Sequence, residues 1–376
     1  NVTGILTDAC AIADLLHRHG AYSFWDYAAA APYVDIDMFP SCDEHPRAHK
    51  DAVFFSPHKL IGGPGTPGVL VVRRELAGQR RPVVPGGGTV AYVSETEHRY
   101  LTDPVHREEG GTPAIIESIR AGLVFALKGQ IGVPLIQSRE KVFLARALTA
   151  WRANPAIEIL GNTDAERLSI ISFLIRRPGG YYLHHNFVVA LLNDLFGIQT
   201  RGGCSCAGPY GHRLLHIDPA TSREFEHEII AGCEGIKPGW TRLNFNYFIS
   251  DAVADYLIEA VGIIAADGWR FLPDYTFDPA SGLWRHRRQP AQPPLRLSMV
   301  SFAEPTLLTA AVPQRTAPES AMGEYLDEAR RLVAARRAAG GDGASGAVGG
   351  GVGSGLSPEV EQLRWFELPP ECLPRQ

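Results

Sequence analysis

The sequence predicts an α/β protein with a mostly parallel sheet, followed by a smaller α+β unit. Helices and strands alternate up to about residue 110, and the strands are continuous apolar runs. Such strands are typical of parallel sheets, which are covered on both faces. Hydrophobic residues make up 45% of the 376 residues and charged residues 20%, so the chain can bury a sizeable core. At roughly 150 residues per domain, this length suggests two domains and an excess.

The first unit is predicted to hold one helix and three buried strands. Apolar residues recur at helical spacing over 7–19, and Gly20 is a suitable stop for that helix. A strand then ends at Asp26, and two further apolar strands cover 52–56 and 69–74. Ligands of α/β sheets usually bind at the loops that follow the strands, so a site is expected where these strands end.

After residue 114 the sequence changes to long amphipathic helices and short strands. The predicted helices cover 115–129, 138–153, 185–196, 222–231 and 250–266, and the predicted strands cover 156–160, 168–176 and 241–245. Beyond residue 270 a Pro-rich basic linker at 285–298, a lone helix at 321–339 and a Gly/Ser-rich stretch at 340–355 follow. We therefore expect domains at 1–120 and 121–270, with the boundary in the first long helix, and a tail at 271–376.

Charge and cysteine content exclude several classes of protein. A net charge of −5 and a pI near 6.2 give no basic footprint of a nucleic-acid binder. No run approaches the roughly 18 apolar residues that span a bilayer, so no membrane partner is expected. Six cysteines are too few for a disulfide scaffold and fit a reducing compartment, which predicts a cytoplasmic protein. The chain starts with neither Met nor a secretory signal, and we expect it to be N-terminally truncated.

The densest chemical signal is Ser-Pro-His-Lys at 56–59, at the end of a predicted buried strand. A lysine in such a place, followed by the Gly-rich turn GGPGTPG, is suited to form a Schiff base with a carbonyl group. Taken alone, Lys59 is better explained as an ordinary surface lysine beside a turn. Asp26 taken alone is likewise better explained as a cap or turn former.

Together, Asp26 and Lys59 favour a cofactor site. Both end buried strands of one α/β layer, as required if a carboxylate holds a pyridinium nitrogen while a lysine binds the same ring covalently. Ser56 and His58 offer a hydroxyl and an imidazole for a phosphate group. Ala28 is small enough to lie flat against a ring face.

Six short motifs follow one another along the chain. They are Asn-Val-Thr-Gly at the start, Asp-x-Ala at 26–28, Ser-x-His-Lys at 56–59, Pro-Gly-Gly-Gly at 85–88, Glu-Gly-Gly-Thr-Pro at 109–113 and Arg-x-Gly-x-x-Cys-Ala at 201–207. Each is weak by itself, but their common order resembles the class V, fold type I pyridoxal-phosphate enzymes, specifically the cysteine desulfurases. The resemblance covers residues 1 to about 266. It implies a fold type I PLP-transferase, here the C-terminal half of a large domain plus a small domain, with pyridoxal 5′-phosphate as the cofactor.

The resemblance also implies a role for each matching residue. Lys59 would bind the cofactor covalently and shuttle substrate protons, and Asp26 would pair with the pyridinium nitrogen. Ser56 and His58 would bind the phosphate, and Thr112 would reach the phosphate of the other subunit in a homodimer. Two further residues concern the substrate: Asn1 matches the residue beside the cofactor hydroxyl and the substrate carboxylate, and Arg242 matches the arginine that grips the α-carboxylate.

The segment RGGCSCAG indicates the reaction. Cys206 stands where desulfurases carry their nucleophilic cysteine, which implies attack on the sulfur of a cysteine substrate, a persulfide on Cys206 and release of alanine. Cys204 makes a Cys-x-Cys that is more similar to the molybdenum-cofactor sulfurase branch. Arg201 would help by stabilising the thiolate. A structural thiol pair and a metal site with His212 and His216 are the competing interpretations; we assign no metal.

Two departures from the family pattern bear on function. Ala29 stands where desulfurases have Gln, and a long insert separates Cys206 from Arg242.

The expected partners are a small amino acid, with cysteine favoured, a second subunit and a sulfur acceptor. Another class V reaction, such as transamination, epimerisation or lyase chemistry, and a non-catalytic binding protein are the alternatives. His184 and His185 are expected to cap a helix and pack at the surface. The remaining cysteines are expected to be incidental or buried thiols: Cys10, Cys42, Cys233 and Cys372.

Overall fold

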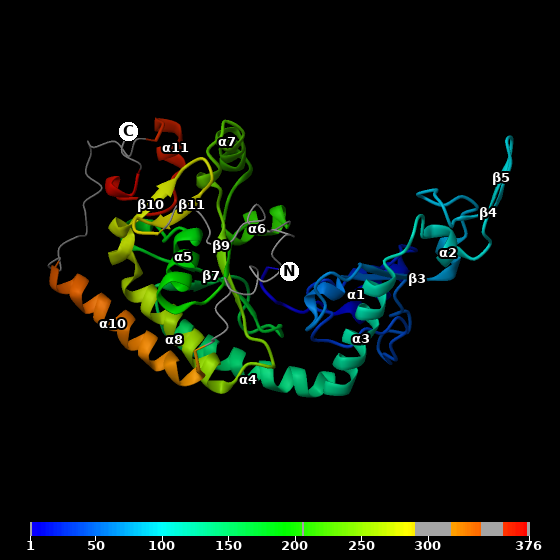
Figure 1. The fold of residues 1–376 in the computed structure, drawn as a ribbon, viewed down its shortest axis with the longest axis horizontal. Coiled ribbons are helices and arrows are strands. Elements are labelled where there is room, and N and C mark those ends of the chain that lie inside the picture. The colour runs from blue at the N-terminus through cyan, green and yellow to red at the C-terminus, as the bar shows by residue number, and fades with distance from the viewer. Residues whose placement is uncertain (1, 205–206, 290–316, 340–355, 374–376) are drawn as a thin grey trace, which may run out of the picture. The chain divides into compact units, whose positions relative to one another are not determined.

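A computed structural model describes residues 2–204, 207–289, 317–339 and 356–373 (Figure 1). The chain forms two compact units: residues 6–140, called here the lysine unit, and residues 1–5 with 141–376, called the arginine unit. The boundary falls in the second long helix, α4 (Val133–Arg152), whereas the sequence places it in the first, α3 (Ile115–Ile131). The reason is that α3 belongs to the lysine unit, where its Val124 packs against Leu60.

The lysine unit is built on a three-stranded sheet in the order β1–β2–β3. Its elements are α1 (Ala9–Arg18), β1 (Phe24–Asp26), β2 (Ala52–Phe55), β3 (Val69–Val72), β4 (Val90–Val93), β5 (His98–Tyr100), α2 (Pro104–Glu108) and α3. β1 and β2 are parallel, whereas β2 pairs antiparallel with β3 and β4 with β5. Among the described strands the parallel arrangement is therefore confined to β1 and β2. Two adjacent parallel strands need a long crossover connection, which is usually a helix. The loop between β2 and β3 holds only a single 3-10 turn, and these two strands pair antiparallel.

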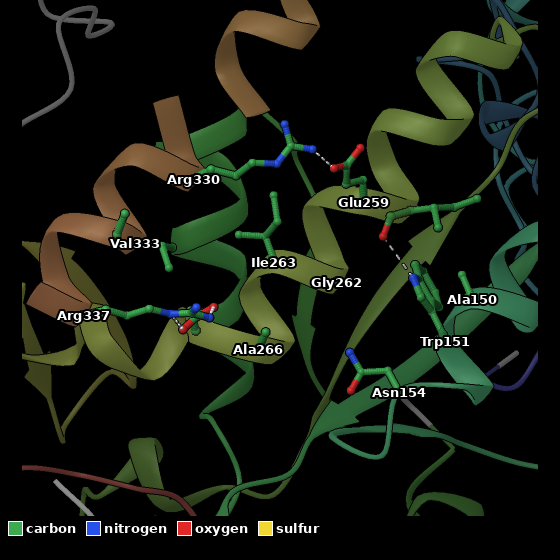
Figure 2. A pocket seen from close by; sticks show the side chains of 13 residues that line it. Ala150, Trp151, Asn154, Glu259, Gly262, Ile263, Ala266, Arg330, Val333 and Arg337 are labelled. Atoms are coloured by element: carbon green, nitrogen blue, oxygen red, sulfur yellow. Dashed lines mark hydrogen bonds and ion pairs between the residues drawn. The ribbon is translucent and has the colours of Figure 1, made fainter. Parts of the chain in front are cut away.

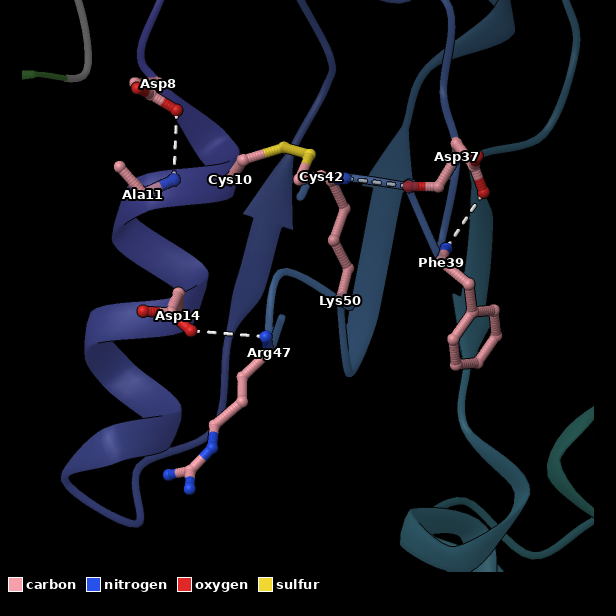
Figure 3. The surroundings of a disulfide bond; sticks show 9 residues. All are labelled: Asp8, Cys10, Ala11, Asp14, Asp37, Phe39, Cys42, Arg47 and Lys50. Atoms are coloured by element: carbon pink, nitrogen blue, oxygen red, sulfur yellow. Dashed lines mark hydrogen bonds between the residues drawn. A yellow bond between two sulfur atoms is a disulfide. The ribbon is translucent and has the colours of Figure 1, made fainter. Parts of the chain in front are cut away.

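A disulfide joins Cys10 and Cys42, whose Cα atoms lie 6.8 Å apart (Figure 3). The expectation that both are incidental thiols is wrong. The bond fixes the first turn of α1 to the long loop between β1 and β2. Arg47 of the same loop donates its backbone N–H to the Asp14 carboxylate on α1 at 3.2 Å. Cysteine content did not indicate this pair because a count carries no information about distance in space.

The arginine unit holds a four-stranded antiparallel sheet in the order β6–β7–β9–β8. Its elements up to residue 267 are β6 (Ile157–Ile159), β7 (Ile170–Ile175), α5 (His185–Phe196), β8 (Arg201–Gly203), α6 (Gly208–Leu214), α7 (Pro219–Ile230), β9 (Trp240–Asn244) and α8 (Asp251–Asp267). Every residue of β7 is buried, so this strand is central to the core. One face of the sheet packs on helices through residues such as Phe173 and Leu243, with Phe187 of α5 and Val261 of α8. This is the α+β unit that the sequence predicts.

The C-terminal residues extend this core instead of forming a tail. They contribute β10 (Tyr275–Asp278), β11 (Leu283–His286), α10 (Met322–Ala339) and α11 (Pro358–Leu363). α10 lies along α8 (Figure 1), and its Val333 is buried with Phe366 and Cys372 in the same cluster as the sheet residues. The proposed linker at 285–298 begins inside β11, and the Gly-rich stretch 340–355 lies outside the described residues. Apolar residues at helical spacing in 322–339 are what place α10 in the core.

His184 and His185 begin α5 and are buried, with exposed fractions of 1% and 6%. The predicted capping is confirmed, since His184 Nδ1 accepts from the Asn186 N–H at 3.1 Å. The predicted surface packing is wrong: His184 stacks on Trp365, which reaches it from the C-terminal segment. Burial disfavours the imidazolium, which puts the pKa of His184 well below 6.5 and lowers the pKa of His185 to about 4. Both rings are therefore neutral parts of the core at neutral pH.

Over the described ranges, no single helix has the length and apolar character to cross a membrane. α3 and α4 satisfy that test only as a pair, on length and composition alone, and they are bent by 75° where they meet.

Candidate active site

The segment from Ser56 to Lys59 leaves β2 as a single 3-10 turn, η1 (Pro57–Lys59). Pro57 and Leu60 are buried, whereas the side chains of His58 and Lys59 are exposed. The Lys59 N–H donates to the Ser56 carbonyl oxygen at 3.1 Å, and the Leu60 N–H donates to that of Pro57 at 2.9 Å. The turn therefore holds an imidazole and an amine on a fixed backbone between two buried anchors.

Asp26 ends β1, and the strand register pairs it with Phe54, two residues before Ser56. Because parallel strands deliver their carboxyl ends to one edge of a sheet, Asp26 and the lysine turn leave from the same edge. Asp26 Oδ1 accepts from the Ala28 N–H at 2.7 Å, which fixes the turn that follows β1. The structure thus gathers Asp26, Ala28 and the lysine turn at a single edge.

The two glycine motifs of the lysine unit pack against each other. The Gly111 N–H donates to the Gly87 carbonyl oxygen at 2.8 Å. Thr89, which is fully buried, donates its hydroxyl to the Gly86 carbonyl oxygen at 2.6 Å and closes the first motif. Gly111 has φ of 91°, a conformation that favours glycine, and Thr112 follows it with an exposed side chain. The role of Thr112 at a partner's phosphate stays a prediction.

Arg242 lies on β9, where the register pairs it with Ser172 of β7 and Arg201 of β8. Like charges directly opposite each other on neighbouring strands are destabilising, so two guanidinium groups in register favour an anion beside them. Both arginines line a cavity of about 550 Å³, together with Asn244 and Thr200. The Thr200 hydroxyl is buried and has no hydrogen-bond partner within the described ranges. Cationic and polar groups of this kind suit a small carboxylate ligand.

The segment that follows Asn1 lies beside this position. The Ser172 hydroxyl donates to the Val2 carbonyl oxygen at 2.6 Å, and the Leu168 N–H donates to that of Gly4 at 2.8 Å. Because Ser172 is the register partner of Arg242, the first residues of the chain run next to the predicted carboxylate-binding arginine. Asn1 and Cys206 themselves lie outside the described residues. Cys204, two residues before Cys206, is an exposed free thiol.

The structure therefore describes the predicted site as two separate groups. Asp26, Ala28, Ser56, His58, Lys59 and Thr112 belong to the lysine unit, and Arg242 with the segment after Asn1 belongs to the arginine unit. Sequence reasoning missed the contributions of Gly63 and Ser172. Gly63 folds the loop after β2 back onto the lysine turn. The Gly-Gly-Pro-Gly run at 62–65 is the sequence feature that could have indicated this contact. Ser172 had no local signal, because only strand pairing brings it to Arg242.

A further polar cluster, not predicted from the sequence, surrounds Asp51 in the lysine unit. His17 Nε2 lies 2.8 Å from Asp51 Oδ2, and the rings of His17 and His49 stack with centroids 4.0 Å apart. These are metal-ligating residue types, but Arg73 Nη1 lies 3.0 Å from Asp51 Oδ1 and 3.1 Å from His49 Nε2. A guanidinium thus already stands where a metal ion would be held, and the cluster links α1 to β2 and β3.

The lysine-unit residues fit pyridoxal phosphate. A carboxylate, an amine, a hydroxyl and an imidazole leave one sheet edge, which are the donors that a pyridinium ring, an aldehyde and a phosphate require. In the described part of the chain, no hydrogen bond or ion pair engages the side chains of Ser56, His58 and Lys59, and His58 and Lys59 are exposed. These groups are therefore not already committed to structural contacts.

Comparison with known proteins places this geometry in context. Residues 1–221 match the family described as Aminotransferase class-V. The chain is 33% identical over 210 residues to a cysteine desulfurase of Klebsiella pneumoniae, covering 56% of this chain and 48% of the relative. It is 28% identical over 223 residues to a probable cysteine desulfurase of Halobacterium salinarum, covering 59% and 50%. The chain thus spans about half the length of these relatives.

Solved structures give the same fold. The apo structure of a cysteine desulfurase from Thermococcus onnurineus aligns with a TM-score of 0.56 at 24% identity, over 71% of this chain and 58% of that one. A cysteine desulfurase from Escherichia coli aligns with a TM-score of 0.52 at 24% identity, over 69% and 56%. At this identity the alignments establish the fold, which agrees with the fold type I class that the motifs imply.

Proposed function

Since the chain belongs to the class-V aminotransferase family, we propose that it carries the lysine, carboxylate, arginine and cysteine of a pyridoxal-phosphate-dependent cysteine desulfurase. The observation that supports this most directly is the register of β1 and β2, which brings Asp26 and the Ser56–Lys59 turn to one sheet edge. The matched relatives, named cysteine desulfurases, support the choice of reaction. The motif order around Cys206 supports the same choice.

Each group of the lysine unit has a definite task. When bound, pyridoxal phosphate supplies an electron sink that weakens bonds at the α- and β-carbons of an amino acid. Lys59 holds the cofactor through its amine and moves the proton at the substrate α-carbon. Asp26 keeps the ring nitrogen protonated, which the sink requires. Ser56 and His58 hold the phosphate, and Thr112 of a second subunit completes that site in a homodimer.

The arginine unit holds and attacks the substrate. Arg242 binds the substrate α-carboxylate through two N–H donors, and we assign Asn1 to binding the same carboxylate. The Cys206 thiolate attacks the sulfur of the substrate cysteine, forming an S–S bond while the carbon–sulfur bond breaks. The carbon keeps the bonding electron pair and takes up a proton, which yields alanine, and Cys206 becomes a persulfide. A sulfur acceptor then removes the outer sulfur.

The test is alanine formation from L-cysteine by the full chain supplied with pyridoxal phosphate. Without an added thiol, about one alanine per active site is expected, because the persulfide blocks a second turnover; dithiothreitol restores turnover. Lys59→Ala and Cys206→Ser abolish alanine formation, whereas Cys204→Ser, the matched control in the same loop, retains it. Alanine formation that survives Cys206→Ser contradicts the persulfide step. Cofactor binding without alanine formation favours another class V reaction.

A further inference from the structure

The strand that leads to the cysteine segment ends against a buried histidine. β8 ends at Gly203, Cys204 follows it directly, and Cys206 comes two residues after that. The backbone of β8 pairs with that of β9, with Gly203 opposite Trp240. β8 also packs on the start of α5, where His185 is buried. The point at which the cysteine segment leaves the sheet is therefore bounded by β9 and by His185.

Two segments of backbone touch the His185 ring, one on each side of its Cγ atom. A Cβ built on Gly202 of β8 would lie 3.2 Å from His185 Nδ1, and one built on Gly239 would lie 2.7 Å from His185 Cδ2. Gly239 is the last residue before β9, near the end of the insert that separates Cys206 from Arg242. Because neither glycine has room for a side chain, the ring sets how closely both segments approach α5.

Gly239 also meets the end of β8 directly. A Cβ at Gly239 would lie 2.6 Å from the Gly203 carbonyl carbon and 2.8 Å from Gly203 Cα. These are backbone atoms, which cannot rotate away as a side chain can. Gly203 itself has φ of 111°, in the region that favours glycine. The residue immediately before Cys204 is thus confined by backbone contacts as well as by strand pairing.

His185 is itself held in place by its neighbours. Its Nδ1 lies 2.9 Å from Asn186 Oδ1, and Asn186 Nδ2 donates to the Gly282 carbonyl oxygen at 2.8 Å. The His185 ring stacks on Trp365, with centroids 5.7 Å apart. A Cβ built on Gly202 would also lie 2.6 Å from Asn186 Oδ1, so the same amide group limits the approach of β8. The ring and the amide together form a fixed surface under the strand.

The helix that carries His185 is fixed by the core behind it. α5 packs against α8 and α10 in the main core of the arginine unit. Two ion pairs join α8 to α10 (Figure 2). Arg330 pairs with Glu259, and Arg337 lies 2.6 Å from Asp267. α5 therefore rests on two helices that are tied to each other.

We propose that His185 is a positioning residue for the desulfurase reaction: its ring supports the end of β8 and so sets the point from which the cysteine segment reaches the substrate. This inference rests on the proposed function, in which the Cys206 thiolate attacks the substrate sulfur. Cys206 follows Gly203 by three residues, so their Cα atoms are at most about 11 Å apart. Over so short a reach, a shift of about 1 Å at the strand end carries through to the thiol, and a misplacement of that size can slow a reaction about a hundredfold.

The test compares two adjacent buried histidines in the full chain supplied with pyridoxal phosphate and dithiothreitol. His185→Ala is expected to lower the kcat of alanine formation about a hundredfold, with the KM for cysteine within about twofold of wild type, because the groups proposed to bind cysteine are unchanged. His184→Ala, the matched control, deletes a buried ring that contacts Trp365 and Phe366 and keeps a kcat close to that of wild type. His185→Phe, which replaces the ring without its nitrogens, recovers most of the kcat.

Hydrogen exchange of the backbone amides of residues 200–204 gives a readout that does not depend on activity. Exchange is expected to be faster in His185→Ala than in His184→Ala, because β8 loses its support. If wild type forms no alanine, the proposed function fails, and hydrogen exchange still tests the support of β8.

Gly239→Ala tests the same contact with His185 in place. Its methyl group would displace the Gly203 backbone, so kcat is expected to fall while binding of pyridoxal phosphate, followed by absorbance, stays unchanged. Gly208→Ala, at a position where a Cβ meets nothing within 4 Å, is the control. Should a thermal melt show His185→Ala unfolded, these two glycine variants decide.

Two results overturn the proposal. The first is a kcat in folded His185→Ala and in Gly239→Ala that equals the kcat of the respective control. The second is equal hydrogen exchange of residues 200–204 in His185→Ala and His184→Ala, which shows that the ring does not support β8.

Discussion

Gly63 approaches Pro57 so closely that a Cβ at Gly63 would lie 2.0 Å from the Pro57 carbonyl oxygen. Its own N–H donates to the Leu60 carbonyl oxygen at 3.0 Å, so the loop folds back directly onto the turn that carries Lys59. The contact is with backbone, which cannot rotate away as a side chain can. The geometry of the lysine turn therefore depends on a glycine four residues further along the chain.

Gly63→Ala is expected to displace the lysine turn and weaken cofactor binding. A methyl group forced into this space costs about 1–3 kcal/mol, relieved only by moving the backbone around Pro57. The measurement is a titration with pyridoxal phosphate, followed by the absorbance of the bound cofactor. Gly122→Ala on α3, where a Cβ meets nothing within 4 Å, is the control and retains wild-type affinity. Unchanged affinity in Gly63→Ala contradicts this account of the loop.

Reduction of the Cys10–Cys42 disulfide is expected to destabilise the lysine unit. The bond joins residues 32 apart in sequence, for which loop-closure entropy gives about 3–4 kcal/mol. Urea unfolding of wild type with and without dithiothreitol measures the loss. Cys42→Ser is expected to be equally destabilised and insensitive to the reductant. Cys233→Ser, which alters a free thiol, is the control and keeps the response of wild type.

His17 is expected to make the lysine unit more stable below neutral pH. Burial alone disfavours the imidazolium, but the bonds to Asp51 and the Arg47 carbonyl oxygen outweigh it and raise the pKa of His17 above 6.5. The stabilisation is therefore fully present below pH 6.5 and is lost as the pH rises through the folded pKa. Asp51, whose pKa is lowered, stays ionised throughout this range.

The measurement is the free energy of unfolding of wild type and His17→Gln between pH 5.5 and pH 8.5. The difference between the two proteins is expected to shrink as the pH rises. His19→Gln, at the end of the same helix, serves as the control, with a pH dependence like that of wild type. A wild-type curve that parallels His17→Gln at every pH shows that His17 does not gain a proton-linked partner on folding.

Phe366→Ala is expected to destabilise the arginine unit by about 3–5 kcal/mol. Phe366 is fully buried, and its ring contacts those of His184 and Phe277. Thermal unfolding of the full chain measures the effect, with Leu332→Ala on the outer side of α10 as the exposed control. A loss no larger than that of Leu332→Ala indicates that the C-terminal segment is not part of the folded core.

The elements of the chain follow from local pattern, and so the sequence predicted most of them. Helix α5 is predicted at its observed bounds, and β2, β3, β7 and β9 are predicted within two residues at either end. The lysine turn and its Gly-rich loop are likewise local, because Ser56 to Gly63 are contiguous. The motifs identified the family for the same reason: each lies within a few residues of sequence.

Contacts between distant residues were decided only by the tertiary structure. Three such contacts join positions far apart in sequence, where no local pattern at one position indicates the other. They are the Cys10–Cys42 bond, the pairing of Arg201 with Arg242 and the stacking of His184 on Trp365. The C-terminal segment reads as a tail because Pro-rich and Gly/Ser-rich stretches flank its predicted helix, yet Phe366 fills a space that remote elements create. Backbone preference and hydrophobic period act over a few residues, whereas packing and strand register depend on the whole unit.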